Sequence, residues 1–332
     1  MKRRAFLGSL PFLGLPLPAR SEKVSYPAAV PGRKLVFPRD HGAHPDYRIE
    51  WWYVTGWLES VTGPRGFQIT FFRARPEETS ANPSSFNPRQ VLFAHAAVSD
   101  PKRGRLLHDQ RAARAGFTLA EAETERTGVW IDDWRLELEG YRYRANIAGR
   151  DFAFDFTLFA RDTILQGDGG FSRKGHRPQE ASYYYSRPHL AVAGKLDGRE
   201  VEGMAWLDHE WSSAYMAPEA VGWDWCGINL FDGSSLMAFR MRDQSGKTHY
   251  APPGVSFKPL RTWKSPRTGV EYPVEMQVND LVLRPLMDDQ ELDSRASTNT
   301  IYWEGAVRAF AKNSEIGRGY LELTGYWKPM KL

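Results

Sequence analysis

The chain has 332 residues, 13% of them aromatic, a formal net charge of +4 and one cysteine. Four of the positive charges lie near the N-terminus, at Lys2, Arg3, Arg4 and Arg20, and no basic run follows, which argues against a nucleic-acid partner. Cys226, as the single cysteine, excludes an internal disulfide, and a chain of this length is sufficient for two domains of about 150 residues.

Residues 1–20 have the pattern of a bacterial export signal. Arg3 and Arg4 precede a short apolar run, and this segment contains no acidic residue. Such a run is too short for a permanent anchor, and an arginine pair followed by Phe6 and Leu7 is typical of the twin-arginine route. We therefore expect a signal peptide over 1–20, a periplasmic protein, and no membrane-spanning segment after cleavage.

The rest of the chain is typical of an antiparallel β protein. Residues 67–73 alternate after a turn at 62–66, and residues 152–158 place three phenylalanines and a leucine on one strand face. Residues 236–242 likewise place two methionines and a phenylalanine opposite two arginines. The only helix expected is a short one within Ala112–Thr124. Half-polar strands of this kind fit β-barrels or sandwiches.

A weak internal repeat suggests two related β domains. Residues 54–59 and 192–197 have similar sequences, and each is followed by a turn, a glycine and an aromatic strand. A Gly-rich, charged stretch at 167–182 separates the two halves. We therefore expect one β domain over 21–182 and a second over 183–332.

The first candidate site segment is residues 40–53, in which acidic residues, histidines and tryptophans are close together. Glu50 is a candidate catalytic acid because a carboxyl group beside an indole ring loses hydration and its pKa rises. Trp52 and Tyr53 are candidate ligand contacts. His41 and His44 have a spacing that permits a shared metal ion, but no third ligand is evident, so no metal is expected.

The second candidate segment is residues 206–225. If residues 207–211 are extended, Asp208 and Glu210 share one strand face while His209 and Trp211 share the other. By the same alternation along a strand, Trp223 and Trp225 point to one side and Asp224 points to the other. The pair His209 and Trp211 is therefore expected to face a cavity, and the alternative for Asp208 and Glu210 is a structural bond to a neighbouring loop or an arginine.

The motifs of this chain resemble those of the AttH-like / carotenoid 1,2-hydratase-like lipocalin family. The similar segments occur in order over about residues 35–328, which makes the resemblance specific. They are the segments 40–56, 165–175, 205–211, 222–225, 302–307 and 319–326.

The resemblance implies two tandem lipocalin-like antiparallel β-barrels, of a size that can hold one small ligand. Some members add water across a terminal double bond of an acyclic carotenoid; others are called secreted hydrolases or are associated with ABC-type export systems. In the hydratases a histidine and a tryptophan two residues apart are candidates for catalysis, and His209 and Trp211 match them. Where those members have a tyrosine and an aspartate, this chain has Phe239 and Arg240 in the neighbourhood.

The first functional hypothesis is an exported acid–base enzyme, a hydro-lyase or a hydrolase, acting on an isoprenoid or lipid-like molecule. An acid protonates the alkene, aromatic rings face the resulting cation, and His209 positions the water. The expected catalytic residues are His209, Asp208, Glu50 and Glu210. The expected ligand contacts are Trp211, Trp223, Trp225, Tyr53, Trp52 and Trp206.

The second hypothesis is a non-catalytic periplasmic lipid-binding accessory of an AttH-type ABC exporter, whose permease is then its partner. A metal-dependent hydrolase using His41, His44 and His209 is a third. No cofactor is expected in either of the first two cases.

Overall fold

The computed structural model describes residues 22–79 and 89–330, so the expected signal peptide lies outside the described residues. Within these ranges the regular secondary structure is antiparallel strand, apart from the 3-10 helix η1 (Arg39–His41). The prediction of an all-β protein is confirmed. No helix in these ranges is long and apolar enough to cross a membrane. A short ladder pairs β1 (Glu22–Lys23) with β4 (Glu78–Thr79).

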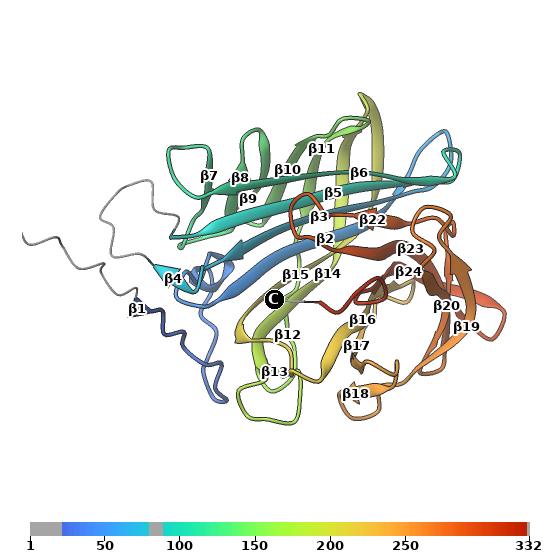
Figure 1. The fold of residues 1–332 in the computed structure, drawn as a ribbon. Coiled ribbons are helices and arrows are strands. Elements are labelled where there is room, and N and C mark those ends of the chain that lie inside the picture. The colour runs from blue at the N-terminus through green and yellow to red at the C-terminus, as the bar shows by residue number, and fades with distance from the viewer. Residues whose placement is uncertain (1–21, 80–88, 331–332) are drawn as a thin grey trace, which may run out of the picture.

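The first sheet curls into a nearly closed barrel (Figure 1). Its strand order is β6-β5-β3-β2-β15-β14-β11-β10-β9-β8-β7, with β12 and β13 paired to β14. At the seam, Arg111 of β6 donates to the Ile131 carbonyl of β8 at 3.1 Å. The strands are β2 (Ile49–Glu59), β3 (Arg65–Ala74), β5 (Val91–Asp100), β6 (Arg105–Arg114), β7 (Ala120–Ala122), β8 (Gly128–Ile131), β9 (Trp134–Glu139), β10 (Arg142–Ala148), β11 (Ala153–Phe159), β12 (Ile164–Leu165), β13 (Phe171–Arg173), β14 (Ala181–Leu196) and β15 (Arg199–Ala214).

The second sheet forms a half-barrel that packs against the first (Figure 1). Its order is β18-β17-β16-β24-β23-β21-β20-β19, with β22 paired to β23. The strands are β16 (Ala220–Leu230), β17 (Ser235–Asp243), β18 (Thr248–Tyr250), β19 (Phe257–Lys264), β20 (Glu271–Val278), β21 (Leu281–Pro285), β22 (Glu291–Asp293), β23 (Ile301–Ala311) and β24 (Ser314–Leu323). The two curved sheets are consistent with the expected pair of lipocalin-like barrels.

The chain passes from the first sheet to the second between β15 and β16. This change lies C-terminal to the boundary expected at 182/183, because the long hairpin of β14 and β15 belongs to the first sheet. The two segments of the internal repeat, 54–59 and 192–197, both lie in that sheet, on either side of β15. Both segments of the repeat thus belong to the same sheet.

The helix expected within Ala112–Thr124 is absent. Residues up to Arg114 complete β6, which pairs with β5, and a bridge between Gly116 and Ala120 closes the turn that leads into β7. Phe117 and Thr118, at that turn, have φ angles of 57° and 62°, which no α-helix contains. The alanine-rich composition favoured a helix locally, but pairing with β5 overrides this preference.

Residues 205–212 of β15 and most of the neighbouring strand β2 are buried on both faces, because they lie between the interior of the first barrel and the second sheet. One face of β15 packs Ala205, Leu207 and Trp211 into the core of the first barrel. The opposite face carries Trp206, which packs with Trp225 of the second sheet. A one-residue step along β15 therefore moves a side chain from the barrel core to the interface.

Candidate functional site between the two sheets

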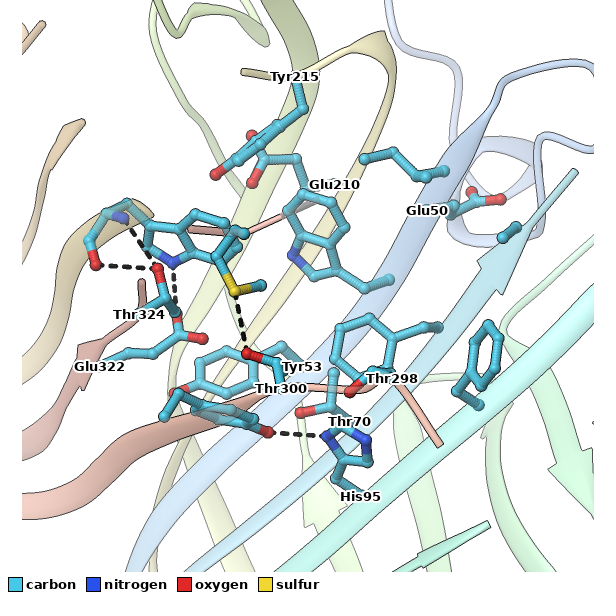
Figure 2. A pocket seen from close by; sticks show the side chains of 18 of the residues that line it. Glu50, Tyr53, Thr70, His95, Glu210, Tyr215, Thr298, Thr300, Glu322 and Thr324 are labelled. Atoms are coloured by element: carbon cyan, nitrogen blue, oxygen red, sulfur yellow. Dashed lines mark hydrogen bonds between the residues drawn. The ribbon is translucent and has the colours of Figure 1, made fainter. Parts of the chain in front are cut away.

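A cavity of about 380 Å³ lies between the two sheets, and most of its lining is apolar (Figure 2). Its walls come from β2, β3, β5, β14 and β15 of the first sheet and from β16, β23 and β24 of the second. The loop 297–300 also contributes to the lining. The site thus lies between the domains, whereas the interior of the first barrel is filled by its own side chains.

Asp208 lines this cavity without a cationic partner among the described residues. Its carboxyl group accepts hydrogen bonds from Tyr184 Oη at 2.6 Å, Ser186 Oγ at 2.5 Å and Trp206 Nε1 at 2.7 Å. Burial raises the pKa of Asp208 to about 7, although these three donors act in the opposite direction. Near neutral pH this side chain therefore exists in both protonation states.

Glu210, on the same face of β15, differs from Asp208 because it has a buried cation beside it. Lys174 Nζ lies 2.6 Å from Glu210 Oε1 and 4.0 Å from the ring centre of Phe239. Ser182 also donates to this carboxylate. Burial raises the pKa of Glu210, while the ammonium group favours its charged form. The two neighbouring carboxyl groups thus have different environments, one with neutral donors and one with a cation.

Aromatic side chains form the remaining walls near these carboxyl groups. Trp223 and Trp225 both line the cavity, and the aspartate between them points away to two arginines. The indole of Trp225 donates to Tyr184 Oη at 3.0 Å. Tyr53 of β2 lies opposite Asp208 in the strand register and lines the same cavity. The expected side-chain parities at 208–211 and 223–225 are therefore both observed.

His209 and Trp211 face the interior of the first barrel and not this cavity. Glu50, which also lines the cavity (Figure 2), joins the same interior network: its Oε1 lies 2.9 Å from His209 Nε2 and 2.7 Å from His44 Nδ1. Its Oε2 accepts from Arg73 Nε at 2.8 Å and from the backbone N–H of His44 at 2.8 Å. These charges and donors hold the pKa of Glu50 well below its usual range despite complete burial.

The same network continues through a second histidine. Tyr185 Oη lies 3.2 Å from His209 Nδ1 and 2.8 Å from His41 Nδ1, and Arg187 reaches the far nitrogen of His41. Burial lowers the pKa of His41 to about 3 and that of His209 to about 4, so both imidazoles are neutral at physiological pH.

Two expected ligand contacts are also part of this interior network. The rings of Trp211 and His44 stack with centres 3.7 Å apart, and those of Trp52 and His209 stack at 4.6 Å. The expected contacts Trp52 and Trp211 therefore support the interior histidines. Trp206 contributes to two places: its indole N–H bonds Asp208, which lines the first cavity, and its side chain lines a second cavity of about 360 Å³.

The comparisons with known proteins agree with this architecture. The AttH-like family model matches residues 28–326. The chain belongs to the AttH-like family. A crystal structure of a Nitrosomonas europaea protein provisionally named AttH is 49% identical, with a TM-score of 0.84, and the match covers 90% of this chain and 99% of that one.

A more distant structural likeness of this AttH-like protein is to kievitone hydratase from Nectria haematococca. The TM-score is 0.61 at 14% identity, over 94% of this chain and 99% of that one, which shows a common fold. No curated protein matches the sequence of this AttH-like chain.

The sequence reasoning did not single out two further polar residues that line the cavity of this AttH-like protein. They are Glu322 of β24 and His95 of β5 (Figure 2), and Glu304 lies directly opposite Glu322 on the neighbouring strand β23. Glu304 and Glu322 both occur in the closing motifs of the family resemblance, which is the signal that could have identified them. His95 bonds Tyr302 at 2.8 Å and so joins the two sheets.

The interior network of the AttH-like protein also contains the residue types of a metal site. One ligand atom from each of His44, Glu50 and His209 lies within 4.8 Å of the others. His41 is not part of this group, since its ring bonds Tyr185 and Arg187. The positive guanidinium of Arg73 bonds Glu50 directly and opposes a second cation there. The contacts therefore fit a hydrogen-bonded network better than a metal centre.

We predict that dialysis against a chelator leaves the melting temperature of the protein unchanged. The physical reason is that Glu50 is already neutralised by Arg73 and bonded by both histidines. Differential scanning fluorimetry before and after dialysis, with elemental analysis of the purified protein, checks this. A stoichiometric metal whose removal lowers the melting temperature would contradict the prediction.

Proposed function

We propose that this protein binds an apolar small molecule in the cavity between its sheets and adds water across a double bond of that molecule. The observation that supports this proposal is the pair of unlike carboxyl groups, Asp208 and Glu210, on one face of β15 in an aromatic cavity. Titratable groups whose environments differ in this way are suited to act as acid and base.

The proposed reaction begins with a proton transfer from neutral Asp208 to one alkene carbon. The other carbon becomes cationic and faces Trp223, Trp225 or Tyr53, whose ring electrons stabilise positive charge. A water molecule attacks that carbon, and its excess proton passes to the Glu210 carboxylate. Transfer of this proton back to Asp208 restores both groups, so the net change is the alkene and one water giving an alcohol.

This assignment differs from the sequence-based hypothesis in two residues. Glu50 is held as a carboxylate by Arg73 and by the histidines, so it has no proton to donate at neutral pH. His209 points into the barrel, where Glu50 and Tyr185 occupy its ring nitrogens. We propose that both residues fix the positions of β2 and β15; Glu50 also lines the cavity, where it has no proton to donate, and His209 does not line it.

The hydrolase alternative has one candidate nucleophile at the cavity. Ser297 Oγ lies 2.9 Å from His95 Nε2, which is the distance of a serine–histidine pair. Ser297, however, donates its hydroxyl proton to Gln110 Oε1 at 2.7 Å, so His95 is the donor in this contact. That arrangement is unsuited to serine activation, and water addition is the better-supported chemistry.

The test offers the purified protein two alkene probes, kievitone and an acyclic carotenoid, in water labelled with a heavy oxygen isotope. The first probe is chosen because a protein of the same fold is named kievitone hydratase. We expect mass spectrometry to detect a product heavier by one labelled water. If both alkene probes bind to the protein but neither gains water, the proposed reaction is contradicted.

Binding without reaction would instead favour the second function, a periplasmic lipid-binding accessory of an ABC exporter. Export through the twin-arginine route and contact with a permease are part of that alternative. Co-purification of a membrane permease with the protein from its own periplasm and membranes, together with an intact bound lipid, would support it.

A further inference from the structure

Glu322 of β24 lines the cavity, and the proposed reaction gives it no role (Figure 2). Its side chain comes from the second sheet, whereas Asp208 lines the same cavity from the first. The Trp223 indole N–H donates to Glu322 Oε2 at 2.9 Å, and Trp225 lies directly opposite Glu322 in the strand register. Glu322 is therefore a carboxyl group held beside the two tryptophans that line the reaction site.

Glu322 and Asp208 differ from the other carboxyl groups of the cavity because neither has a cation beside it. Within the described part of the chain, Glu50 and Glu210 form ion pairs with buried cations, whereas Asp208 and Glu322 form none. Glu322 is partly exposed to the cavity, yet burial still raises its pKa to about 7, and burial raises the pKa of Asp208 to about 7 as well. When either group ionises, its negative charge therefore has no protein cation to balance it.

A positive charge on the ligand would balance the charge of these two groups. In the proposed reaction such a charge arises when the proton leaves Asp208, because the ligand becomes a cation and Asp208 becomes a carboxylate. The rings of Trp223, Trp225 and Tyr53 line the same cavity, and ring electrons attract cations. The Glu322 carboxylate then supplies a second negative charge, from the sheet opposite Asp208, at low dielectric where charges interact strongly.

We propose that Glu322 is a further catalytic residue, whose carboxylate stabilises the positive charge that develops on the ligand between the two sheets. This inference rests on the proposed function, because the charge is that of the proposed intermediate. It also defines a class of ligand that the cavity should hold without any reaction, namely apolar molecules that carry a permanent positive charge. Such molecules resemble the intermediate, and enzymes bind analogues of the transition state more tightly than the substrate.

The test compares two probes of the same shape, phenyltrimethylammonium and tert-butylbenzene, which differ by one positive charge. Three tryptophans line the cavity (Trp51, Trp223 and Trp225), so quenching of intrinsic fluorescence measures both dissociation constants. At about pH 8 we expect phenyltrimethylammonium to bind about tenfold or more tightly than tert-butylbenzene, because the carboxylates and the aromatic rings both attract the charge.

The affinity for phenyltrimethylammonium should depend on pH, whereas that for tert-butylbenzene should not. The cation favours the charged forms of Asp208 and Glu322, so its affinity should increase as the pH rises through about 7 and then level off. Replacing Glu322 alone separates its contribution from those of the neighbouring charged groups. These are Glu210 with Lys174, Glu304, and Asp224 with Arg240 and Arg242.

The Glu322→Gln variant should reduce the preference for the cation to about threefold or less and leave tert-butylbenzene binding unchanged, because glutamine keeps the shape of the side chain but has no charge. Asp208→Asn should have the same effect, which provides a second variant if one of them does not fold. The matched control is Glu315→Gln on the same strand, at a position that does not line the cavity, and it should keep the full preference.

Failure of this inference and failure of the proposed function give different results. Equal binding of the two probes, a cation affinity that does not change with pH, a preference that survives in Glu322→Gln, or failure of the cation to bind would each overturn the role of Glu322. A protein that prefers the cation through Glu322 but adds water to no alkene retains the cation-binding cavity and loses the proposed reaction. A protein that hydrates alkenes but binds both probes equally retains the reaction and loses the role of Glu322.

Discussion

Replacing Glu50 by Gln is expected to lower the free energy of unfolding by about 3–5 kcal/mol, the usual cost of removing one partner of a buried ion pair. Glu50 is completely buried and accepts from Arg73, from His209 and twice from His44. Glutamine has the same shape but no charge, and its amide group would place a donor against donors. Chemical denaturation of the variant and of the wild type measures the difference.

The effect of this substitution should depend on pH in a defined direction. Because the pKa of Glu50 is lower in the folded state than in the unfolded chain, its contribution to stability is present above about pH 4.5 and is lost as the pH falls through the folded-state value. The difference between variant and wild type should therefore shrink in acid. The control is Glu59→Gln on the same strand, where the side chain is 60% exposed and the expected change is below about 1 kcal/mol. If Glu50→Gln and Glu59→Gln lower the free energy of unfolding by the same amount, the interior network around Glu50 does not stabilise the fold as predicted.

Replacing Asp208 by Asn is expected to reduce kcat/KM for water addition by about 10²–10⁴-fold, the range for loss of a general acid. The amide keeps the approximate shape of the side chain but provides no acidic proton. In the wild type, kcat/KM should fall as the pH rises through about 7, because only the protonated carboxyl is active. The control is Glu202→Gln, an exposed position on the same strand, which should keep wild-type activity.

Loss of activity in this variant is expected without loss of the fold. The pKa of Asp208 is higher in the folded state, so the wild type loses stability as the pH rises from the unfolded value toward about 7. Asparagine does not ionise, so above pH 7 the variant avoids this loss, which offsets a weakened hydrogen bond. Circular dichroism and thermal melting at pH 8 check this point. An unfolded variant, or an active one, would argue against Asp208 as the acid.

The strand parities of the site could be predicted from the sequence, because alternation is a local property of the backbone. The sequence placed Asp208 with Glu210 and His209 with Trp211, as observed. It did not predict which face meets the cavity, because residues 205–212 of β15 are buried on both faces and show no polar, solvent-facing stripe. The histidine–tryptophan pair was therefore expected at the ligand and is found in the barrel.

The opposite wall of the cavity could not be predicted from local patterns. Glu322 is more than one hundred positions from Asp208 in the sequence and lines the same cavity only through the packing of the second sheet. The helix expected within Ala112–Thr124 failed for a similar reason, since pairing with a distant strand decided its conformation. The all-β class and the family were predictable because they depend on repeated patterns along the whole chain.

The two-sided burial of β15 has a consequence for sequence variation in this family. Even-numbered positions from 206 to 210 contact the interface and its cavities, while odd-numbered positions from 205 to 211 complete the barrel core. Substitution at Asp208 or Glu210 can therefore change specificity while the core remains intact. Insertion or deletion of a single residue would exchange the two sets at once, so descendants of this scaffold should diversify by point substitution in β15 and keep its length constant.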